Sequence, residues 1–191
     1  MFQQQWQGFC VDNLTQFSRD FFEQSTCEVA QNLLGQILCV SKNGMLKKGM
    51  IVETEAYTQD DPASHSYKKT KRSETMFGMG GLCYVYFIYG MYHCFNIVTE
   101  PSGVGAAVLI RALEPIENLD NTNGPSKLCK QMGIDKNFNG MDLLSNNQIW
   151  LEKGQNIAKN EIISTTRVGI NKAIDMKRRF FIKDNKWVSK K

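Results

Sequence analysis

Residues 84–96 read YVYFIYGMYHCFN, an aromatic stretch that a glycine interrupts near its middle. Tyrosine, valine and phenylalanine favour a pleated, half-buried surface, so the flanks of this stretch are expected to be two strands of a hairpin. Residues 89–92 then form its turn. Large aromatic and apolar side chains gain little at an exposed turn unless they insert into a partner. Stacked bases are a suitable partner, because such side chains can separate neighbouring bases and bend a duplex.

The sequence around this hairpin predicts further antiparallel strands. Residues 36–40 and 47–57 are rich in β-branched and apolar side chains. Asn43-Gly44 lies between them, and this dipeptide is a strong signal for a two-residue hairpin turn. Other short segments also have strand character: 106–115, 149–152 and 179–183.

Two segments carry the signals of helix boundaries. Ser25 and Glu28 match the S-x-x-E capping box, and Gly35 is placed to end the helix that they begin. Pro125 opens a second helix, which Gly133 closes. No repeat or linker divides the chain. The sequence therefore predicts the α+β class: a single domain with a mainly antiparallel, curved β-sheet, surrounding helices and a protruding β-hairpin.

Length and composition indicate an intracellular, single-domain protein. A chain of 191 residues can bury about 70% of its unfolded surface in one core. The six cysteines form no C-x-x-C pair, and the N-terminus lacks a basic, apolar leader, so we expect a protein that is not secreted. No apolar run approaches the roughly 18 residues of a membrane span. We therefore expect no membrane partner.

Positive charge is concentrated in two places, although the formal net charge is only +4. The first cluster is KKTKR at 68–72. The second is the segment 172–191, which holds eight Lys or Arg residues against two Asp. Clusters of this kind either form an ordinary solvated surface or contact phosphate groups.

Several classes of chemistry are poorly supported. His65 and His93 lack the spacing of a metal-binding pair, and no phosphate-binding glycine loop is present. Cys94 adjoins His93, but neighbouring residues on a strand point to opposite faces, so we interpret Cys94 as a core thiol. We therefore expect neither a metal site nor a cofactor.

Carboxylate chemistry remains open. Glu53 and Glu55 share one face of their strand, and either could act as a general base or be an inert surface charge. Arg111 lies within an apolar strand, where a buried guanidinium needs a partner such as a carboxylate or phosphate. A pairing of Arg111 with the glutamates would satisfy this requirement.

A series of motifs runs through nearly the whole chain. They are IVETEAY (51–57), ASHS (63–66), YVYFIYGMYHCFN (84–96), VLIRALEP (108–115), GPSKLC (124–129), RVGI (167–170) and RFFIKDNKWVS (179–189). From about Phe21 to Ser189, their order resembles that of the alkyladenine (3-methyladenine) DNA glycosylase family. The combination of VETEAY, YGMY and RALEP is highly specific.

The resemblance implies a catalytic pair. It identifies Glu55 as the general base that activates water for attack on the anomeric carbon of the deoxyribose, and it leaves Glu53 with a supporting role. It places Arg111 beside the catalytic glutamate, where it helps to orient the water and the backbone of the lesion nucleotide.

The resemblance also implies a pocket for a base turned out of the duplex. Tyr57, His65 and Tyr86 match the aromatic residues that sandwich this base. Asn96 matches the residue that excludes normal guanine through a clash with its 2-amino group. The region between His65 and Met76 departs most from the family pattern, and we interpret it as a candidate phosphate-contacting loop.

At the hairpin tip, the resemblance implies contact with the interior of the duplex. Tyr89 matches the side chain that intercalates into the vacated space, and Met91 and Tyr92 flank it. The glycosylase domain is expected to span residues 21–191, preceded by an extension at 1–20.

The function that the resemblance implies is that of a monofunctional DNA glycosylase in base excision repair. Such an enzyme flips damaged purines out of double-stranded DNA and hydrolyses the N-glycosidic bond, leaving an abasic site. The expected lesions are 3-methyladenine and 7-methylguanine, with hypoxanthine and ethenoadenine as further candidates. The expected protein is a monomer that acts in the cytoplasm at the nucleoid if bacterial, or in the nucleus if eukaryotic.

Two alternatives belong to other classes. A catalytically idle lesion-binding or minor-groove protein would keep the wedge, but would have no use for a base at Glu55. Sugar hydrolysis by paired Glu53 and Glu55 fits the carboxylate separation of inverting glycosidases only marginally. The basic clusters favour a polyanionic partner over a neutral sugar.

Overall fold

The first hairpin forms as its turn residues predict. In the computed structural model, which describes residues 17–88 and 90–189, strand β1 (Ile37–Lys42) pairs antiparallel with β2 (Met45–Tyr57). Asn43 and Gly44 join them with φ angles of 54° and 75°. A two-residue turn of this handedness matches the twist of the flanking strands, which is why Asn-Gly is favoured there.

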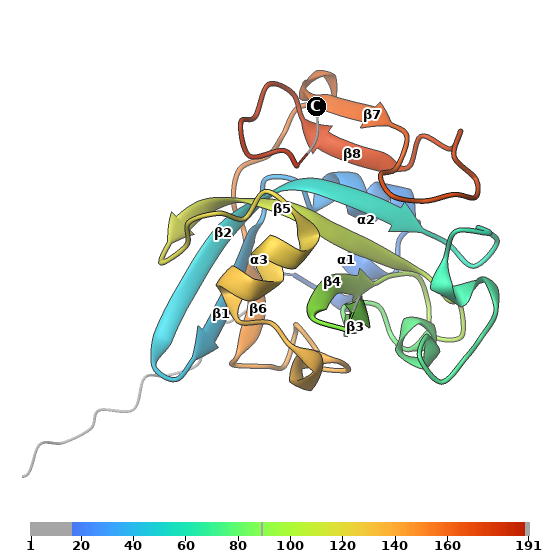
Figure 1. Cartoon of the computed structure of the whole chain (residues 1–191), viewed down its shortest axis with the longest axis horizontal. Coiled ribbons are helices and arrows are strands. Elements are labelled where there is room, and N and C mark those ends of the chain that lie inside the picture. The colour runs from blue at the N-terminus through green and yellow to red at the C-terminus, as the bar shows by residue number, and fades with distance from the viewer. Residues whose placement is uncertain (1–16, 89, 190–191) are drawn as a thin grey trace, which may run out of the picture.

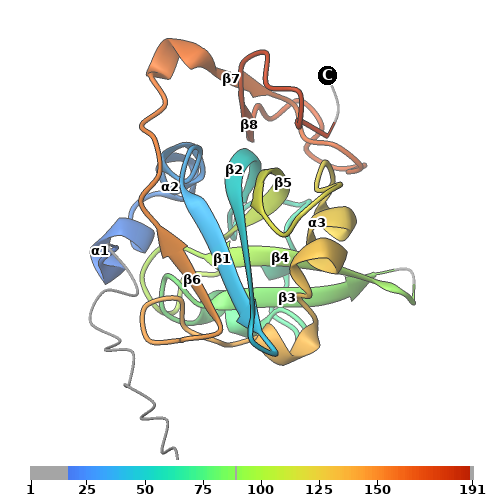
Figure 2. The same ribbon diagram turned by 90° about the vertical axis from the view of Figure 1, so that its left-hand side faces the viewer.

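The described residues form one antiparallel sheet, in the order β3-β4-β5-β2-β1-β6, with β8 pairing to β2 and β7 to β8. The remaining strands are β3 (Cys83–Ile88), β4 (Tyr92–Val98), β5 (Ala107–Glu117), β6 (Ile149–Glu152), β7 (Ile162–Thr165) and β8 (Arg179–Ile182). The sheet curls into a half-barrel, so that β1 and β2 cross the direction of β3 and β4 (Figure 2). The expected class, α+β with a curved antiparallel sheet, is confirmed.

The centre of β2 is where the sheet changes its pairing. The register between β2 and β5 shifts between Ile51 and Glu53 and again between Glu53 and Thr54. Over Glu53 to Glu55, β2 also pairs with β8. Irregularities of this kind bend a strand and re-aim its side chains, and they are common beside active sites. Here they flank Glu53 and lie just before Glu55, the two glutamates that the sequence singles out.

The helices cover the sheet at separate places. They are α1 (Arg19–Phe22), α2 (Thr26–Asn32) and α3 (Pro125–Met132), with 3-10 turns η1 (His65–Tyr67), η2 (Glu74–Phe77), η3 (Lys136–Phe138) and η4 (Lys159–Glu161). Figure 2 shows α2 and α3 on opposite sides of β2 and β5. Within the described ranges, none of the helices has the length and apolar character needed to cross a membrane.

The predicted helix boundaries are reproduced for α3 but only in part for α2, which begins after Ser25 as expected and ends at Asn32, three residues before Gly35. Helix α3 begins with Pro125 and ends at Met132, and the following Gly133 caps it with a left-handed φ of 75°. The capping box expected before α2 does not form. The Ser25 hydroxyl instead donates to the Glu28 carboxylate, at 2.5 Å, so these two exposed side chains pair with each other and the Ser25 side chain caps no backbone amide.

The β3–β4 hairpin extends outward past α3 (Figure 2). Its strands pair from Cys83 with Ile97 to Ile88 with Tyr92, so Tyr92 begins β4 and does not belong to the turn where the sequence placed it. At its inner end the hairpin joins the core, because Tyr84 is fully buried in a cluster with Met76, Val98 and Ala107. The hairpin thus links the interior of the protein to an exposed tip.

Candidate active site

The two glutamates of β2 are both fully buried, which the sequence did not anticipate. Glu53 accepts hydrogen bonds from Arg111 Nε at 3.0 Å and Arg179 Nε at 2.7 Å. It also accepts from the backbone amide of Ser189 at 2.6 Å. A buried charge must be paired, and three segments distant in sequence supply these partners. Glu53 is therefore a junction that holds the C-terminal segment to the sheet.

Glu55 has a different environment. Its Oε2 accepts a hydrogen bond from the Tyr57 hydroxyl at 2.8 Å, and its Oε1 accepts one from the Val168 amide at 2.8 Å. Arg111 Nη1 lies 3.3 Å from the same Oε1. All three contacts come from donors, so the carboxyl group is held as an acceptor in a fixed orientation.

Arg111 bridges the two carboxylates. Its Nε contacts Glu53 and its Nη1 contacts Glu55, in the fork geometry that suits carboxylate recognition. Burial alone would lower the pKa of Arg111, but the Glu55 and Glu53 charges raise it above its usual value. The expected pairing of Arg111 with this face of β2 is thus present.

A cavity of about 600 Å³ opens beside Glu55. Its size lies within the range of small-ligand pockets. Six of the residues that the sequence analysis singled out line it together: Glu55, Tyr57, His65, Tyr86, Asn96 and Arg111. They come from β2, the following loop, β3, β4 and β5, so the curl of the sheet is what brings them together.

One wall of the cavity is aromatic. The His65 and Tyr86 rings meet edge to face, with centroids 4.6 Å apart, and Tyr84 lies 5.5 Å from Tyr86. His65 Nδ1 and the Tyr84 hydroxyl are 2.9 Å apart and share a hydrogen bond. Burial, followed by the charge of Arg72, lowers the pKa of His65. The imidazole is therefore neutral near pH 7.

Tyr57 forms another part of the lining and is tied to Glu55. Burial, followed by the Glu55 charge, raises the pKa of Tyr57, so its hydroxyl keeps the proton that it donates to that carboxylate. On the same ring, the Arg167 guanidinium lies 4.6 Å from the centroid. A flat ring held at both its hydroxyl and its face is well suited to stacking against a planar ligand.

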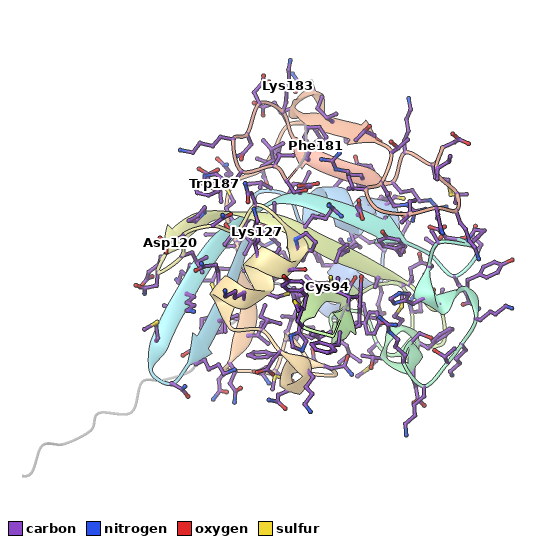
Figure 3. The ribbon with its side chains drawn as sticks, viewed as in Figure 1. Cys94, Asp120, Lys127, Phe181, Lys183 and Trp187 are labelled. Atoms are coloured by element: carbon purple, nitrogen blue, oxygen red, sulfur yellow. The ribbon has the colours of Figure 1, made fainter. Side chains whose placement is uncertain are left out.

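Asn96 and Cys94 occupy the β4 side of the cavity. Asn96 Nδ2 donates to the Tyr84 carbonyl oxygen at 2.9 Å, directly across the hairpin, and this bond fixes the amide. Cys94 lies on β4 near the centre of the molecule (Figure 3). Burial raises the pKa of its thiol, which agrees with the interpretation of a core thiol over a nucleophile.

The hairpin tip is exposed on both sides of its turn. Met91 is 64% exposed and Tyr92 is 44% exposed. Phe87, which the sequence analysis did not single out, is also exposed and lies against His93 with ring centroids 4.9 Å apart. Tyr89, the residue expected to intercalate, lies outside the described residues.

Sequence reasoning missed two groups that shape the site. The Val168 amide, which contacts Glu55, could not be singled out because backbone groups carry no sequence signal. Arg167 forms a fully buried ion pair with Asp61 and donates to the Ala56 carbonyl oxygen at 3.0 Å. The RVGI motif drew attention to Arg167, but nothing in the sequence identified Asp61 as its partner.

The arrangement suits activation of water beside a flat ligand. A buried carboxylate borders a cavity with aromatic walls, and one oriented acceptor there can take a proton from water. In the described part of the chain, no group of three or more His, Cys, Asp or Glu residues could hold a metal ion.

Comparison with known proteins adds independent information. The family model described as methylpurine-DNA glycosylase matches residues 20–186. A protein of Carboxydothermus hydrogenoformans is 46% identical over 187 residues, covering 91% of this chain and 98% of its own length. Relatives from Clostridium perfringens (43%; 91% and 98%) and Francisella tularensis (45%; 87% and 94%) are similar. All three carry the name "Putative 3-methyladenine DNA glycosylase".

Proposed function

The chain belongs to the methylpurine-DNA glycosylase family and is a DNA glycosylase, and from this premise we propose that it removes 3-methyladenine from duplex DNA. Its proposed substrates also include 7-methylguanine and the neutral lesions hypoxanthine and ethenoadenine. The damaged purine leaves the base stack, enters the cavity beside Glu55 and is released as a free base. The DNA strand keeps an abasic site.

The observation that carries this proposal is the position of Glu55. Its carboxylate is fully buried, borders a cavity large enough for a purine and is oriented by three donors. The two oxygens of a carboxylate have about four acceptor positions in total, so three contacts leave about one for a water molecule. A protein that only binds lesions would gain nothing from this arrangement.

In the proposed reaction, Glu55 accepts a proton from water as the water oxygen attacks the anomeric carbon. A bond from oxygen to that carbon forms, and the bond to the purine nitrogen breaks with its electron pair leaving on the base. Arg111 keeps the carboxylate aimed at the cavity. Alkylated purines already carry positive charge and are good leaving groups, whereas hypoxanthine needs a proton from the pocket or from water.

Selection of damaged purines is proposed to occur within the aromatic walls. The rings of Tyr57 and Tyr86 attract a positively charged base through a cation–π term of about 0.5 to 2 kcal/mol, which is smaller where the ring already contacts a cation and which a neutral base lacks. Damaged pairs also cost less to open, because flipping requires a few kcal/mol of unstacking energy. Asn96, held by the Tyr84 carbonyl, is proposed to disfavour bases with a 2-amino group and so to reject normal guanine, whereas 7-methylguanine is still released because its positive charge makes it a good leaving group.

The substitution Glu55→Gln tests the proposed chemistry. Glutamine keeps the shape of the side chain but cannot accept the proton, so single-turnover release of 3-methyladenine or hypoxanthine should fall by about 10²- to 10⁴-fold. Binding to the same duplex should change little. Base release is followed by alkaline cleavage of the abasic product.

Glu117→Gln is the matched control, because Glu117 is exposed at the far end of β5. This variant should release bases at the wild-type rate. Undiminished release by the Glu55→Gln variant would remove the assigned base, and absence of release by the wild-type protein from every lesion duplex would refute the proposed function itself.

A further inference from the structure

One member of the basic cluster at 68–72 contacts the aromatic wall of the cavity. The Arg72 guanidinium lies 5.2 Å from the centre of the Tyr86 ring, and its Nη2 donates to the Phe87 carbonyl oxygen at 3.2 Å. The loop that carries Arg72 packs against β3 and β4 through η2 (Figure 1). Although the Arg72 side chain is exposed, these contacts hold its charge beside the site.

The other cations of the cluster are placed differently. Lys69 lies over the Phe77 ring, at 4.9 Å from its centroid. Lys68 and Lys71 are exposed, and among the described residues neither makes a hydrogen bond, an ion pair or a ring contact. An ordinary phosphate-contacting surface would not require one guanidinium to turn onto a cavity wall. Arg72 is therefore distinct from its neighbours.

The charge of Arg72 also reaches two further groups of the wall. The Tyr84 hydroxyl shares a hydrogen bond with His65 Nδ1, and although burial raises the pKa of Tyr84, the Arg72 charge acts to lower it. The same charge contributes to the lowered pKa of His65. The Arg72 charge therefore acts on three groups of the wall, Tyr86 by ring contact and Tyr84 and His65 electrostatically.

We propose that Arg72 sets the charge preference of the cavity, disfavouring positively charged purines relative to neutral ones. This inference rests on the proposed function. A base stacked against Tyr86 would lie about 5 to 7 Å from that ring, so a cationic base and the guanidinium would be about 12 Å apart or less. Like charges at such a separation repel, and a neutral base feels no such repulsion.

The shared ring adds to this effect. The π-face of an aromatic ring attracts one cation through its quadrupole, and Arg72 already uses Tyr86 for this purpose. A second cation at the same ring therefore gains less. The aromatic walls favour charged purines, and Arg72 opposes that preference. A cavity with both features can therefore excise charged and neutral purines at similar rates.

The test compares two duplexes that differ only in one base. One carries 7-methylguanine, which has a fixed positive charge, and the other carries hypoxanthine, which is neutral. Single-turnover excision rates give a ratio of charged to neutral lesion for wild type, Arg72→Gln, Arg72→Lys and Lys71→Gln. A ratio cancels any general loss of folding or DNA affinity.

We expect Arg72→Gln to raise this ratio by about threefold to tenfold at low salt, because the repulsion is removed. Arg72→Lys keeps the charge and should stay within about twofold of wild type. Lys71→Gln removes a cation from the same loop without touching the wall and should leave the ratio unchanged. Raising the salt concentration should reduce the difference in this ratio between wild type and Arg72→Gln, because salt screens the charge of the exposed guanidinium.

A second measurement does not depend on catalysis. In the Glu55→Gln background, replacing Arg72 by Gln should lower the dissociation constant of the 7-methylguanine duplex relative to that of the hypoxanthine duplex, because the charged base is then bound more tightly. If Arg72→Gln lowers the excision rates of both bases by the same factor, Arg72 is only a phosphate contact and the inference fails. If Arg72→Lys behaves like Arg72→Gln, hydrogen-bond geometry and not charge is responsible. Failure of the wild type to excise either base would instead refute the proposed function.

Discussion

At the scale of single residues, Glu53 and Glu55 show how one residue type takes two roles two positions apart. Both carboxylates are fully buried on β2 and both contact Arg111. Glu53 is enclosed by donors from β5, β8 and the C-terminal segment, so it is saturated by protein. Glu55 borders the cavity and keeps access to a ligand. The difference lies in the surroundings and not in the side chain.

The buried pair of Asp61 and Arg167 gives a stability prediction at this scale. Replacing Asp61 by Asn leaves the Arg167 charge buried without its counter-ion, and Arg167 Nε and Nη2 already lack a hydrogen-bond partner among the described residues. Breaking such a pair typically costs about 3 to 5 kcal/mol. Urea denaturation should show this loss as a lower midpoint.

The same substitution at an exposed pair provides the control. Asp135 and Lys42 are 3.0 Å apart, with side chains 33% and 43% exposed. Exposed pairs contribute about 1 kcal/mol or less, so Asp135→Asn should have a small effect on the unfolding free energy. Equal losses of unfolding free energy in the two variants would mean that burial does not determine how much the Asp61–Arg167 pair stabilises the protein.

At the scale of elements, the β3–β4 hairpin connects a cavity wall to an exposed tip. Tyr84 and Tyr86 lie at the cavity, while Met91 and Tyr92 lie at the tip. One hairpin can therefore contact the duplex and the displaced base together, provided that the tip is the element that enters DNA.

Replacing Met91 by Ser tests this use of the tip. Met91 is 64% exposed, so the substitution should leave the unfolding free energy within about 0.5 kcal/mol of wild type. Affinity for lesion duplex should fall by about tenfold, because an apolar contact with bases is lost. Met45, 54% exposed at the tip of the β1–β2 hairpin, is the matched control. Equal DNA affinity of wild type and the Met91→Ser variant would count against the proposed role.

The elements differ in how far the sequence reveals them. The Asn43-Gly44 turn and α3 are local features, because turn and capping residues act within a few positions of one another, and both are found as predicted. The register shifts at Glu53 and the second pairing of β2 with β8 depend on strands that are distant in sequence. Periodicity within β2 carries no information about them. The burial of both glutamates could not be inferred for the same reason.

At the scale of the whole molecule, the curl of the sheet is what turns separate motifs into a site. Glu55 on β2, Tyr86 on β3, Asn96 on β4 and Arg111 on β5 meet because neighbouring strands converge on one cavity. The loop after β2 then adds His65. Motif resemblance identified these residues, whereas the partners that hold them, such as Asp61 and the Val168 amide, emerge only from the tertiary structure.

The central claim is that this cavity receives a purine turned out of duplex DNA beside Glu55. A crystal structure of the Glu55→Gln variant bound to a duplex with a single hypoxanthine tests it most directly. We predict that the hypoxanthine lies between Tyr57, His65 and Tyr86, with its anomeric carbon within one water molecule of residue 55. A hypoxanthine that remains stacked in the duplex, or a duplex bound to a face away from the cavity, would contradict the account.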